Sequence, residues 1–402
     1  MSGLSAAEFY GGGGLTAELP GGSLVLGATH QRGKELSVVL RRVDSACHVV
    51  HSFGKDGTAA LALSVETGPY GFVGGSIDTL AAEPDGGLLV AGNDGRYELV
   101  GRLLATGRLD PSFGRNGWAR IRPHEKPAYR TPPPFPTVTS IAIDPSGSIF
   151  LGGNDGEAHC CAQSFVSELT ADGAPVQSFG SNGSIILPAR GFTGSYITQL
   201  ASNGDGSAYA FGEYEQSGCG YPIVVRFGHD GSLDARFDAA VARTLRRVAP
   251  QPFRFTPTLV PGSSGAFALV GGFDKTCGPL SRHPVSSGRA VGILPSGRID
   301  GAFGKAGESP FAAPVFTFDN PLAIRLASGG IVAADELYDG KGRLKRVSVQ
   351  SFASDGSADG RRTIVRARLP HKPYLAGLLP APADEAWLVI GSRSEIELLP
   401  VG

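Results

Sequence analysis

The chain has 402 residues, of which 59 are glycine and 29 are proline, and 41% of its residues are hydrophobic. Such a chain can bury a large core, and its surplus of Gly and Pro predicts many short elements separated by turns, which is typical of an all-β protein. The formal net charge is −1. The chain has no run of five like charges, so nucleic acid is not an expected partner. No apolar stretch approaches the roughly 20 residues of a membrane span, so membrane insertion is not expected either.

The start of the chain, Met1–Ser5, does not join a basic segment to an apolar one, so no signal peptide is predicted. The protein is therefore expected to be cytoplasmic, or to be a mature chain whose leader was removed. In the second case it would be extracellular, periplasmic or at the cell surface. The five cysteines do not decide between these locations, because a disulfide framework on a chain of this length would be sparse.

A turn built on Phe-Gly recurs along the chain. Its clearest copy is LDPSFGRNG at residues 109–117, where Phe113 is expected to be buried and Gly114 and Gly117 stand where the chain reverses with positive φ. Further copies occupy residues 52–57, 178–183 and 300–307, with a worn copy at 234–238.

A second marker is a tight turn followed by an apolar strand that ends in Gly, as in PDGGLLVAG at residues 84–92. Copies of this marker occupy residues 144–152, 204–212, 263–271 and 328–334, with degenerate copies at 20–27 and 383–391. Seven copies about sixty residues apart predict a repeat fold.

Each unit is predicted to contain four short strands. In the third unit these are Val138–Ile143, Ser148–Gly153, Gln163–Leu169 and Ser184–Leu187. Four antiparallel strands joined by short turns make one blade of a β-propeller. No stretch of the chain shows a long helical period, so no helix is expected.

The two ends of the chain look like halves of one unit. The last unit stops near Glu395–Leu399 without a Phe-Gly strand, whereas Phe9–Leu19 is a Phe-Gly strand with no blade before it. We therefore predict an all-β, seven-bladed β-propeller of four-stranded antiparallel blades, its ring closed by the N-terminal strand completing the C-terminal blade. The whole chain is expected to be one domain, with units at about 20–62, 76–122, 137–188, 196–242, 256–312, 321–367 and 374–402 plus 7–19. The phenylalanines expected in the seams between blades are Phe9, Phe53, Phe113, Phe179, Phe237 and Phe303.

Units that begin with PDGGxxVAG and end with LDPSFGxxG resemble the bacterial delta-sixty β-propeller repeat. The second unit is most similar, and the resemblance covers nearly the whole chain. It implies a propeller and a secreted or cell-surface location in bacteria. It implies no catalytic residues, so it bears on the fold and not on an activity.

Long connections are expected to lie on one face of the propeller. They join strands two and three of a unit, or one blade to the next, and the opposite face has only tight turns. Because loops on rigid scaffolds carry function, the predicted ligand- or partner-binding residues come from these connections. They are His124, Tyr129, Arg130, Glu213, Tyr214, Arg282 and His283.

Four cysteines fall in the same connections: Cys160, Cys161, Cys219 and Cys277. They could be free thiols, or Cys219 and Cys277 could form a disulfide that joins two loops. A zinc site that also uses His159 or His283 is a third reading, although no Cys-x-x-Cys spacing is present. No metal, cofactor or catalytic residue is predicted.

Two functions fit these observations. The first is a non-enzymatic propeller that binds a protein or a carbohydrate through its long loops. The alternative is an enzyme at the mouth of the central channel, such as a lyase or a lactone hydrolase. Such an enzyme needs inward-facing carboxylates or histidines on several blades, and the inner strands Val138–Ile143 and Ile197–Leu200 supply few of them.

Overall fold

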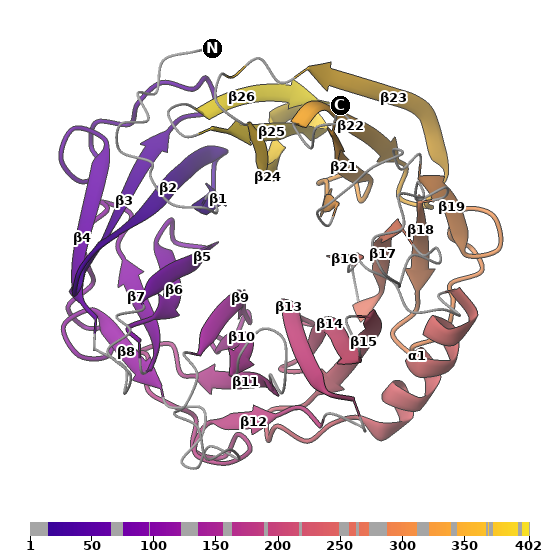
Figure 1. The fold of residues 1–402 in the computed structure, drawn as a ribbon, viewed down its shortest axis with the longest axis horizontal. Helices are drawn as coiled ribbons and strands as arrows, with labels where there is room; N and C mark the ends of the chain where they lie inside the picture. Colours follow the sequence, from indigo (N-terminus) through magenta and orange to yellow (C-terminus); the bar gives the residue numbers. More distant parts are fainter. Residues whose placement is uncertain are drawn as a thin grey trace. The chain divides into compact units, whose positions relative to one another are not determined.

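The computed structural model describes residues 15–65, 75–95, 97–121, 136–155, 163–188, 192–216, 219–248, 257–262, 265–272, 288–311, 321–338, 344–366, 369, 373–392 and 396–401. These residues form seven sheets of antiparallel strands, and in each sheet the strands follow one another in chain order (Figure 1). We number the sheets as blades 1 to 7 along the chain. The fold is a seven-bladed β-propeller, as predicted from the repeats.

Five blades have four strands. Blade 1 consists of β1 (Leu15–Leu19), β2 (Ser23–Arg32), β3 (Glu35–Val43) and β4 (Thr58–Ser64), and blade 2 of β5 (Ser76–Ala82), β6 (Leu88–Asn93), β7 (Glu98–Leu103) and β8 (Trp118–Ile121). Blade 3 consists of β9 (Thr137–Ile143), β10 (Ile149–Asp155), β11 (Gln163–Leu169) and β12 (Ser184–Ile186). Blade 5 consists of β16 (Thr258–Pro261), β17 (Phe267–Gly272), β18 (Gly288–Ile293) and β19 (Glu308–Phe311), and blade 6 of β20 (Leu322–Arg325), β21 (Ile331–Tyr338), β22 (Leu344–Phe352) and β23 (Ala358–Arg366).

Two blades have three strands in the described part of the chain. Blade 4 consists of β13 (Gly194–Ser202), β14 (Ala208–Gln216) and β15 (Cys219–Phe227), and blade 7 of β24 (Tyr374–Ala381), β25 (Glu385–Gly391) and β26 (Ile396–Val401). The chain divides into two compact units. The N-terminal unit holds β1 to β13, β14 as far as Tyr214, and residues 226–233; the C-terminal unit holds residues 215–225, α1 and β16 to β26, so the division falls within β14 and β15.

The first strand is paired differently from the prediction. β1 pairs with β2, with Leu15 opposite Gly27 and Leu19 opposite Ser23. Only residues 20–22 join the two strands, so the chain folds straight back on itself and Leu15–Leu19 becomes the first strand of blade 1. The expectation that this stretch completes blade 7 beside residues 395–399 is therefore wrong for Leu15–Leu19, and Phe9 lies outside the described residues.

A helix stands where the fourth strand of blade 4 was expected. α1 (Ala235–Val248) has 14 residues, and its buried side chains include Phe237, Val241, Leu245 and Val248. Their spacing of four, four and three residues places them on one face of a helix. The expectation that the chain contains no helix is thus wrong. The helical period is present in the sequence, where it overlaps the worn copy of the Phe-Gly turn at residues 234–238.

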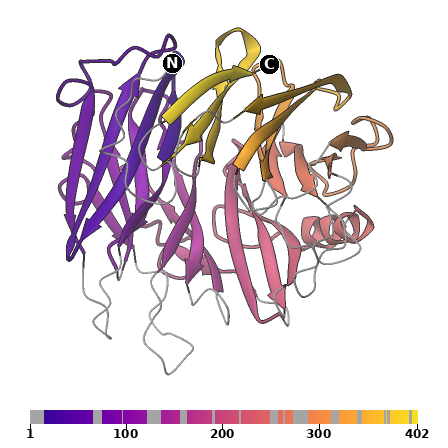
Figure 2. The ribbon, with the colours of Figure 1, turned by 45° about the horizontal axis from the view of Figure 1, so that its top comes forward.

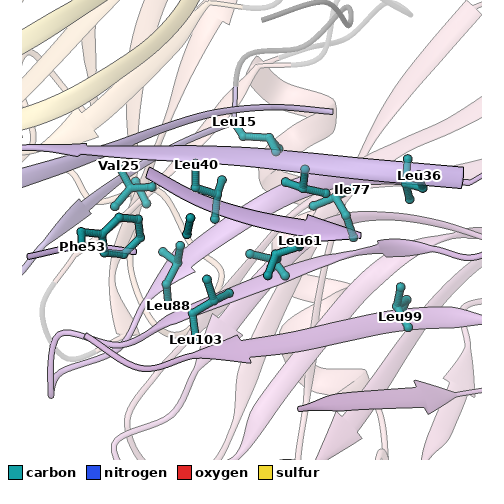
Figure 3. Packing of buried hydrophobic residues seen from close by; sticks show 14 of the residues in the cluster. Leu15, Val25, Leu36, Leu40, Phe53, Leu61, Ile77, Leu88, Leu99 and Leu103 are labelled. Atoms are coloured by element: carbon teal, nitrogen blue, oxygen red, sulfur yellow. The ribbon is translucent and has the colours of Figure 1, made fainter. Parts of the chain in front are cut away.

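The core between blades 1 and 2 shows how neighbouring sheets of the N-terminal unit pack (Figure 3). Leu36, Leu40 and Leu61 of blade 1 and Leu88 and Leu103 of blade 2 belong to one cluster of buried side chains. The long strands of blade 1, drawn in indigo, lie side by side with a marked twist (Figure 2). In β2 the consecutive residues Leu24–Ala28 are all buried, so both faces of that strand are covered, whereas burial alternates along β3 and β4.

The Phe-Gly turn joins blades 1, 2, 3 and 5 to the blade that follows each of them. The amide of its glycine donates a hydrogen bond to a carbonyl in the turn between the third and fourth strands of the following blade. The four bonds are Gly54 N to Thr106 O (2.7 Å), Gly114 N to Asp172 O (2.7 Å), Gly180 N to Asp230 O (2.9 Å) and Gly304 N to Asp355 O (2.6 Å). One turn type therefore both reverses the chain within its blade and fixes the neighbouring blade.

The phenylalanine of the turn fills the same seam. Phe53, Phe113 and Phe303 are at most 5% exposed, and each ring lies under a glycine of the next blade's turn: Gly107, Gly173 and Gly356. Phe179 instead packs against Phe227 of blade 4, with ring centroids 5.8 Å apart. The predicted burial in the seams is confirmed for these residues. Phe237 is also buried, but it belongs to α1 and packs against Phe267 of blade 5.

Candidate functional site

Each blade has two different ends. Because neighbouring strands are antiparallel, the connections from strand one to two and from strand three to four share one end, which we call the tight-turn end. The connections from strand two to three and from one blade to the next share the opposite end, which we call the loop end. The Phe-Gly seams described above therefore all lie at the tight-turn end.

Most of the predicted binding residues lie outside the described residues. These are His124, Tyr129, Arg130, Arg282 and His283, together with His159, Cys160, Cys161 and Cys277. Cys219 begins β15, and its pairing with Cys277 stays a prediction. Within the described part of the chain, no group of three or more His, Cys, Asp or Glu side chains could hold a metal ion. In the same residues no helix is long and apolar enough to cross a membrane.

Glu213 and Tyr214, the other two predicted residues, lie near the loop end of β14. Glu213 is half-buried, whereas Tyr214 is only 5% exposed, so Tyr214 cannot itself provide a contact surface. Its ring stacks on that of Phe192, with centroids 4.8 Å apart and planes 1° from parallel. Phe192 precedes β13 and is half-buried. The more accessible ring of this pair is therefore Phe192, which the sequence reasoning missed.

The first strand of several blades carries a bulge that glycine makes possible. A Cβ on Gly92, Gly153 or Gly212 would overlap a carbonyl oxygen of the first strand of the same blade, namely that of Ser76, Thr137 or Tyr196. In blades 2 and 3 the register shifts at this point, and one residue of the first strand is left over. The glycine that ends each VAG-type strand thus lets the first strand approach closely and bulge.

The residue left over at the bulge of blade 3 is Thr139, and Thr198 stands at the corresponding position of blade 4. Thr139 stands two residues after Thr137, and Thr198 stands two residues after Tyr196; the carbonyl oxygens of Thr137 and Tyr196 are those that the glycines approach. Thr139 donates its hydroxyl proton to Ile197 O of blade 4 at 2.6 Å, with Gly152 O of its own blade at 3.2 Å. Thr198 donates to Phe211 O of its own blade at 3.3 Å. At this position threonine supplies a donor to a backbone carbonyl.

Blade 2 has aspartate at the same position. An ionised carboxylate cannot donate a proton, so Asp78 cannot make the bond that Thr139 and Thr198 make. Instead its Oδ2 accepts a hydrogen bond from Ser76 Oγ at 2.7 Å. Asn93 Nδ2 donates to the same hydroxyl at 3.0 Å, and Asn93 Oδ1 accepts from Gly95 N at 2.9 Å. These bonds fix the direction of the series of hydrogen bonds. Because the Asn93 amide donates to the Ser76 oxygen, the Ser76 proton points at Asp78.

The surroundings of Asp78 disfavour its charge. The side chain is exposed, but the first strands of the neighbouring blades, β1 and β9, flank β5 and crowd the carboxyl. This loss of hydration raises the pKa of Asp78 to about 6, and the Ser76 hydrogen bond offsets only part of the effect. Glu18 on β1 is half-buried, and burial also raises its pKa. The inner strands of the N-terminal unit thus hold two acidic groups that the sequence analysis did not select.

Comparisons with known proteins concern the fold alone. No protein-family model matches the chain, and no curated protein matches it. A polysaccharide lyase is similar in structure with a TM-score of 0.48 and 9% identity, and the similarity covers 100% of this chain and 91% of that one. A prolyl endopeptidase gives a TM-score of 0.42 at 14% identity over 92% of this chain and 46% of that one. The acylaminoacyl peptidase of Pyrococcus horikoshii gives a TM-score of 0.46 at 10% identity, over 97% of this chain and 52% of that one.

The chain spans about half the length of the two peptidases. Identities below 25% indicate a shared type of fold, and TM-scores below 0.5 carry no information about the activity of this chain. The resemblance to the delta-sixty repeat stays a prediction.

Proposed function

We propose that the protein is a non-enzymatic scaffold that binds a protein or carbohydrate partner at the loop end of its blades. The observation that carries the proposal is the repeated seam. Four glycine amides and the phenylalanines beside them fix neighbouring blades at the tight-turn end. The longest connections leave the blades at the other end, where they are free to vary without disturbing these seams.

The aromatic pair at the loop end of blade 4 supports the same proposal. Tyr214 is buried and holds Phe192 parallel to it, so the ring of Phe192 is kept in one orientation. A fixed aromatic ring contributes contact area at little cost in conformational entropy, and it suits the apolar face of a sugar or a peptide side chain.

The experiment begins with a glycan array and with cross-linking to proteins of the source cell, both using the full chain. Affinity for the partner so identified is then compared between the wild type, Phe192→Ala and a triple variant in which Tyr129, Arg130 and Arg282 become alanine. We expect the triple variant to bind at least tenfold more weakly, since one central anchor is worth about 2 kcal/mol. Its melting temperature should not change.

The matched control removes three exposed cations at the tight-turn end: Lys55, Arg115 and Lys305. This control should bind like the wild type. Equal loss of affinity in both triple variants would mean that bulk charge, and not the loop end, is responsible. That outcome would contradict the proposal.

The alternative function is an enzyme that uses the inner strands, such as a lyase or a lactone hydrolase. The observation in its favour is the pKa of Asp78, about 6, because a general acid or base works best when its pKa lies near the working pH. Turnover of a small substrate by the wild type, lost in Asp78→Asn and kept in the loop-end triple variant, would replace the scaffold by this enzyme.

A further inference from the structure

The outer side of α1 is a surface that the repeat fold does not explain. α1 stands where the fourth strand of blade 4 was expected, and it packs on blade 5 through Phe237 and Thr244 (Figure 1). Its exposed side chains are of only two kinds, alanine and arginine: Ala235, Arg236, Ala239, Arg243, Arg246 and Arg247. The acidic residue of the helix, Asp238, is only 6% exposed. The outer side of α1 therefore carries arginine charges and no exposed acid.

The arginines lie close to one line along the helix. At about 3.6 residues per turn, Arg236, Arg243 and Arg247 lie within about 40° of one another around the helix axis, and Arg246 lies beside them. At roughly 1.5 Å per residue, the three positions are about 10 Å and 6 Å apart along the axis. Within the described part of the chain none of the four guanidinium groups forms an ion pair or a hydrogen bond. The helix thus presents a row of unpaired cations about 16 Å long.

The stability of α1 does not account for this row. Arg236 lies in the first turn, where the positive end of the helix dipole disfavours a cation. Arg243 stands three and four residues before Arg246 and Arg247, and like charges at these spacings on a helix repel each other. Only Arg246 and Arg247, in the last turn, are favoured by the dipole. Residues that act against their own element are expected where a partner binds.

A second group of exposed arginines in the C-terminal unit has a structural explanation. Arg346, Arg362 and Arg366 lie on one side of β22 and β23, with Arg346 opposite Arg366. Arg362 Nε donates to Ser348 Oγ at 2.9 Å. β23 is an edge strand, and charge on such a strand prevents another chain from pairing with it. This second group therefore provides a control for the row on α1.

We propose that the outer side of α1 binds a linear sulfated polysaccharide. A guanidinium group pairs well with an anion whose charge is spread over several oxygens, as it is in a sulfate ester. Sulfate groups recur along such a chain, which matches cations arranged in a row. The surface belongs to a helix and not to the loop-end residues, so either proposal can fail without the other.

Other polyanions fit this surface less well. The apolar residues of α1 are packed inside the protein, so the helix cannot enter the interface of an anionic membrane. The exposed side of α1 has no aromatic ring on which the bases of single-stranded nucleic acid could stack. An acidic protein would gain most of its affinity from a large buried anchor, and a surface of alanine and arginine offers no pocket for one. A sulfated polysaccharide needs only the row of charges.

The test measures binding of the full chain to a heparin octasaccharide by calorimetry at low and high salt. An oligogalacturonate with the same number of charges carries carboxylates without sulfates, and a DNA duplex and phosphatidylserine vesicles test the rival surfaces. We expect the heparin fragment to bind about tenfold more tightly than any of these. Its affinity should fall as salt rises, because binding releases counterions.

The key variant combines Arg236→Gln, Arg243→Gln and Arg247→Gln, and glutamine keeps the helix because its helix propensity is close to that of arginine. It should bind the heparin fragment about tenfold more weakly. Its melting temperature should be equal to or above that of the wild type, since repulsion within the row is removed. Arg236→Gln alone, with a loss of about twofold, replaces the triple variant if that does not fold.

The matched control combines Arg346→Gln, Arg362→Gln and Arg366→Gln, which remove the same charge from β22 and β23. It should bind the heparin fragment like the wild type. The proposal is overturned if this control loses as much affinity as the α1 variant, or if the α1 variant binds like the wild type. It is also overturned if the oligogalacturonate, the DNA or the vesicles bind as tightly as the heparin fragment.

Discussion

Gly173 and Gly21 have nearly the same backbone conformation in different surroundings. Their φ angles are +87° and +88°. A Cβ on Gly173 would lie 2.8 Å from the ring of Phe113 in the seam between blades 2 and 3, whereas a Cβ on Gly21 would meet nothing within 4 Å. The pair therefore separates the cost of the left-handed backbone from the cost of crowding a seam.

We predict that Gly21→Ala lowers the free energy of unfolding by about 1 kcal/mol, the conformational cost alone. Gly173→Ala should cost about 1–3 kcal/mol more, because Phe113 is fully buried and has little room to move. Urea unfolding of both variants measures the difference. Equal losses of unfolding free energy in the two variants would show that the Phe113 side chain can move to accommodate the extra methyl group, and that the Phe-Gly seam is not tightly packed.

Residue chemistry also explains why the candidate site was only partly predictable. The loop-end residues were selected by type and by their place in long connections. Asp78 was missed because a single aspartate in an apolar strand carries no signal. It stands out only beside Thr139 and Thr198, whose hydroxyls show what the position does in the other blades.

At the scale of elements, α1 replaces a strand and still holds the seam to blade 5. Thr244 Oγ1 donates to Gly297 O at 2.8 Å, and the backbone of Phe237 and Val241 approaches the same glycine. Gly297 stands in the turn where the other blades accept the Phe-Gly amide. The helix therefore meets the same turn with a different set of atoms.

The start of this helix depends on Asp234. Its Oδ1 accepts hydrogen bonds from Arg236 N at 3.0 Å and Phe237 N at 2.9 Å, which is the arrangement of an N-cap. We predict that Asp234→Ala lowers the free energy of unfolding by about 1 kcal/mol. Asp234→Asn keeps the accepting oxygen and should recover most of that loss. A loss of the same size in both variants, measured by thermal unfolding, would assign the effect to the charge of Asp234 and not to the cap.

At the scale of the whole molecule, the first strand is the element whose role changed most. β1 contributes Leu15, Ala17 and Leu19 to the core between blades 1 and 2, and all three are at most 6% exposed. It also covers one edge of β2. β1 thus belongs to the interior of the N-terminal unit.

We predict that removing residues 1–19 lowers the free energy of unfolding by about 4 kcal/mol or more, because two buried leucines are lost and the edge of β2 is exposed. Removing residues 1–14 leaves β1 in place and should cost far less. Calorimetry on both truncated proteins makes the comparison. If the shorter deletion costs as much as the longer one, residues before β1 carry the stability, as the predicted closure of blade 7 would require.

The sequence by itself determined the type of fold, because the two repeated turns demand particular residues. Replacing a left-handed glycine or a buried phenylalanine by another residue type would lower the stability of the fold. The Phe-Gly turn can therefore be recognised in each of its copies. The tertiary structure alone decided which strand β1 pairs with, since a short apolar strand can add to any open sheet edge of suitable register. It also decided the state of Asp78, because the pKa of a carboxyl depends on the water and charge that neighbouring blades place around it.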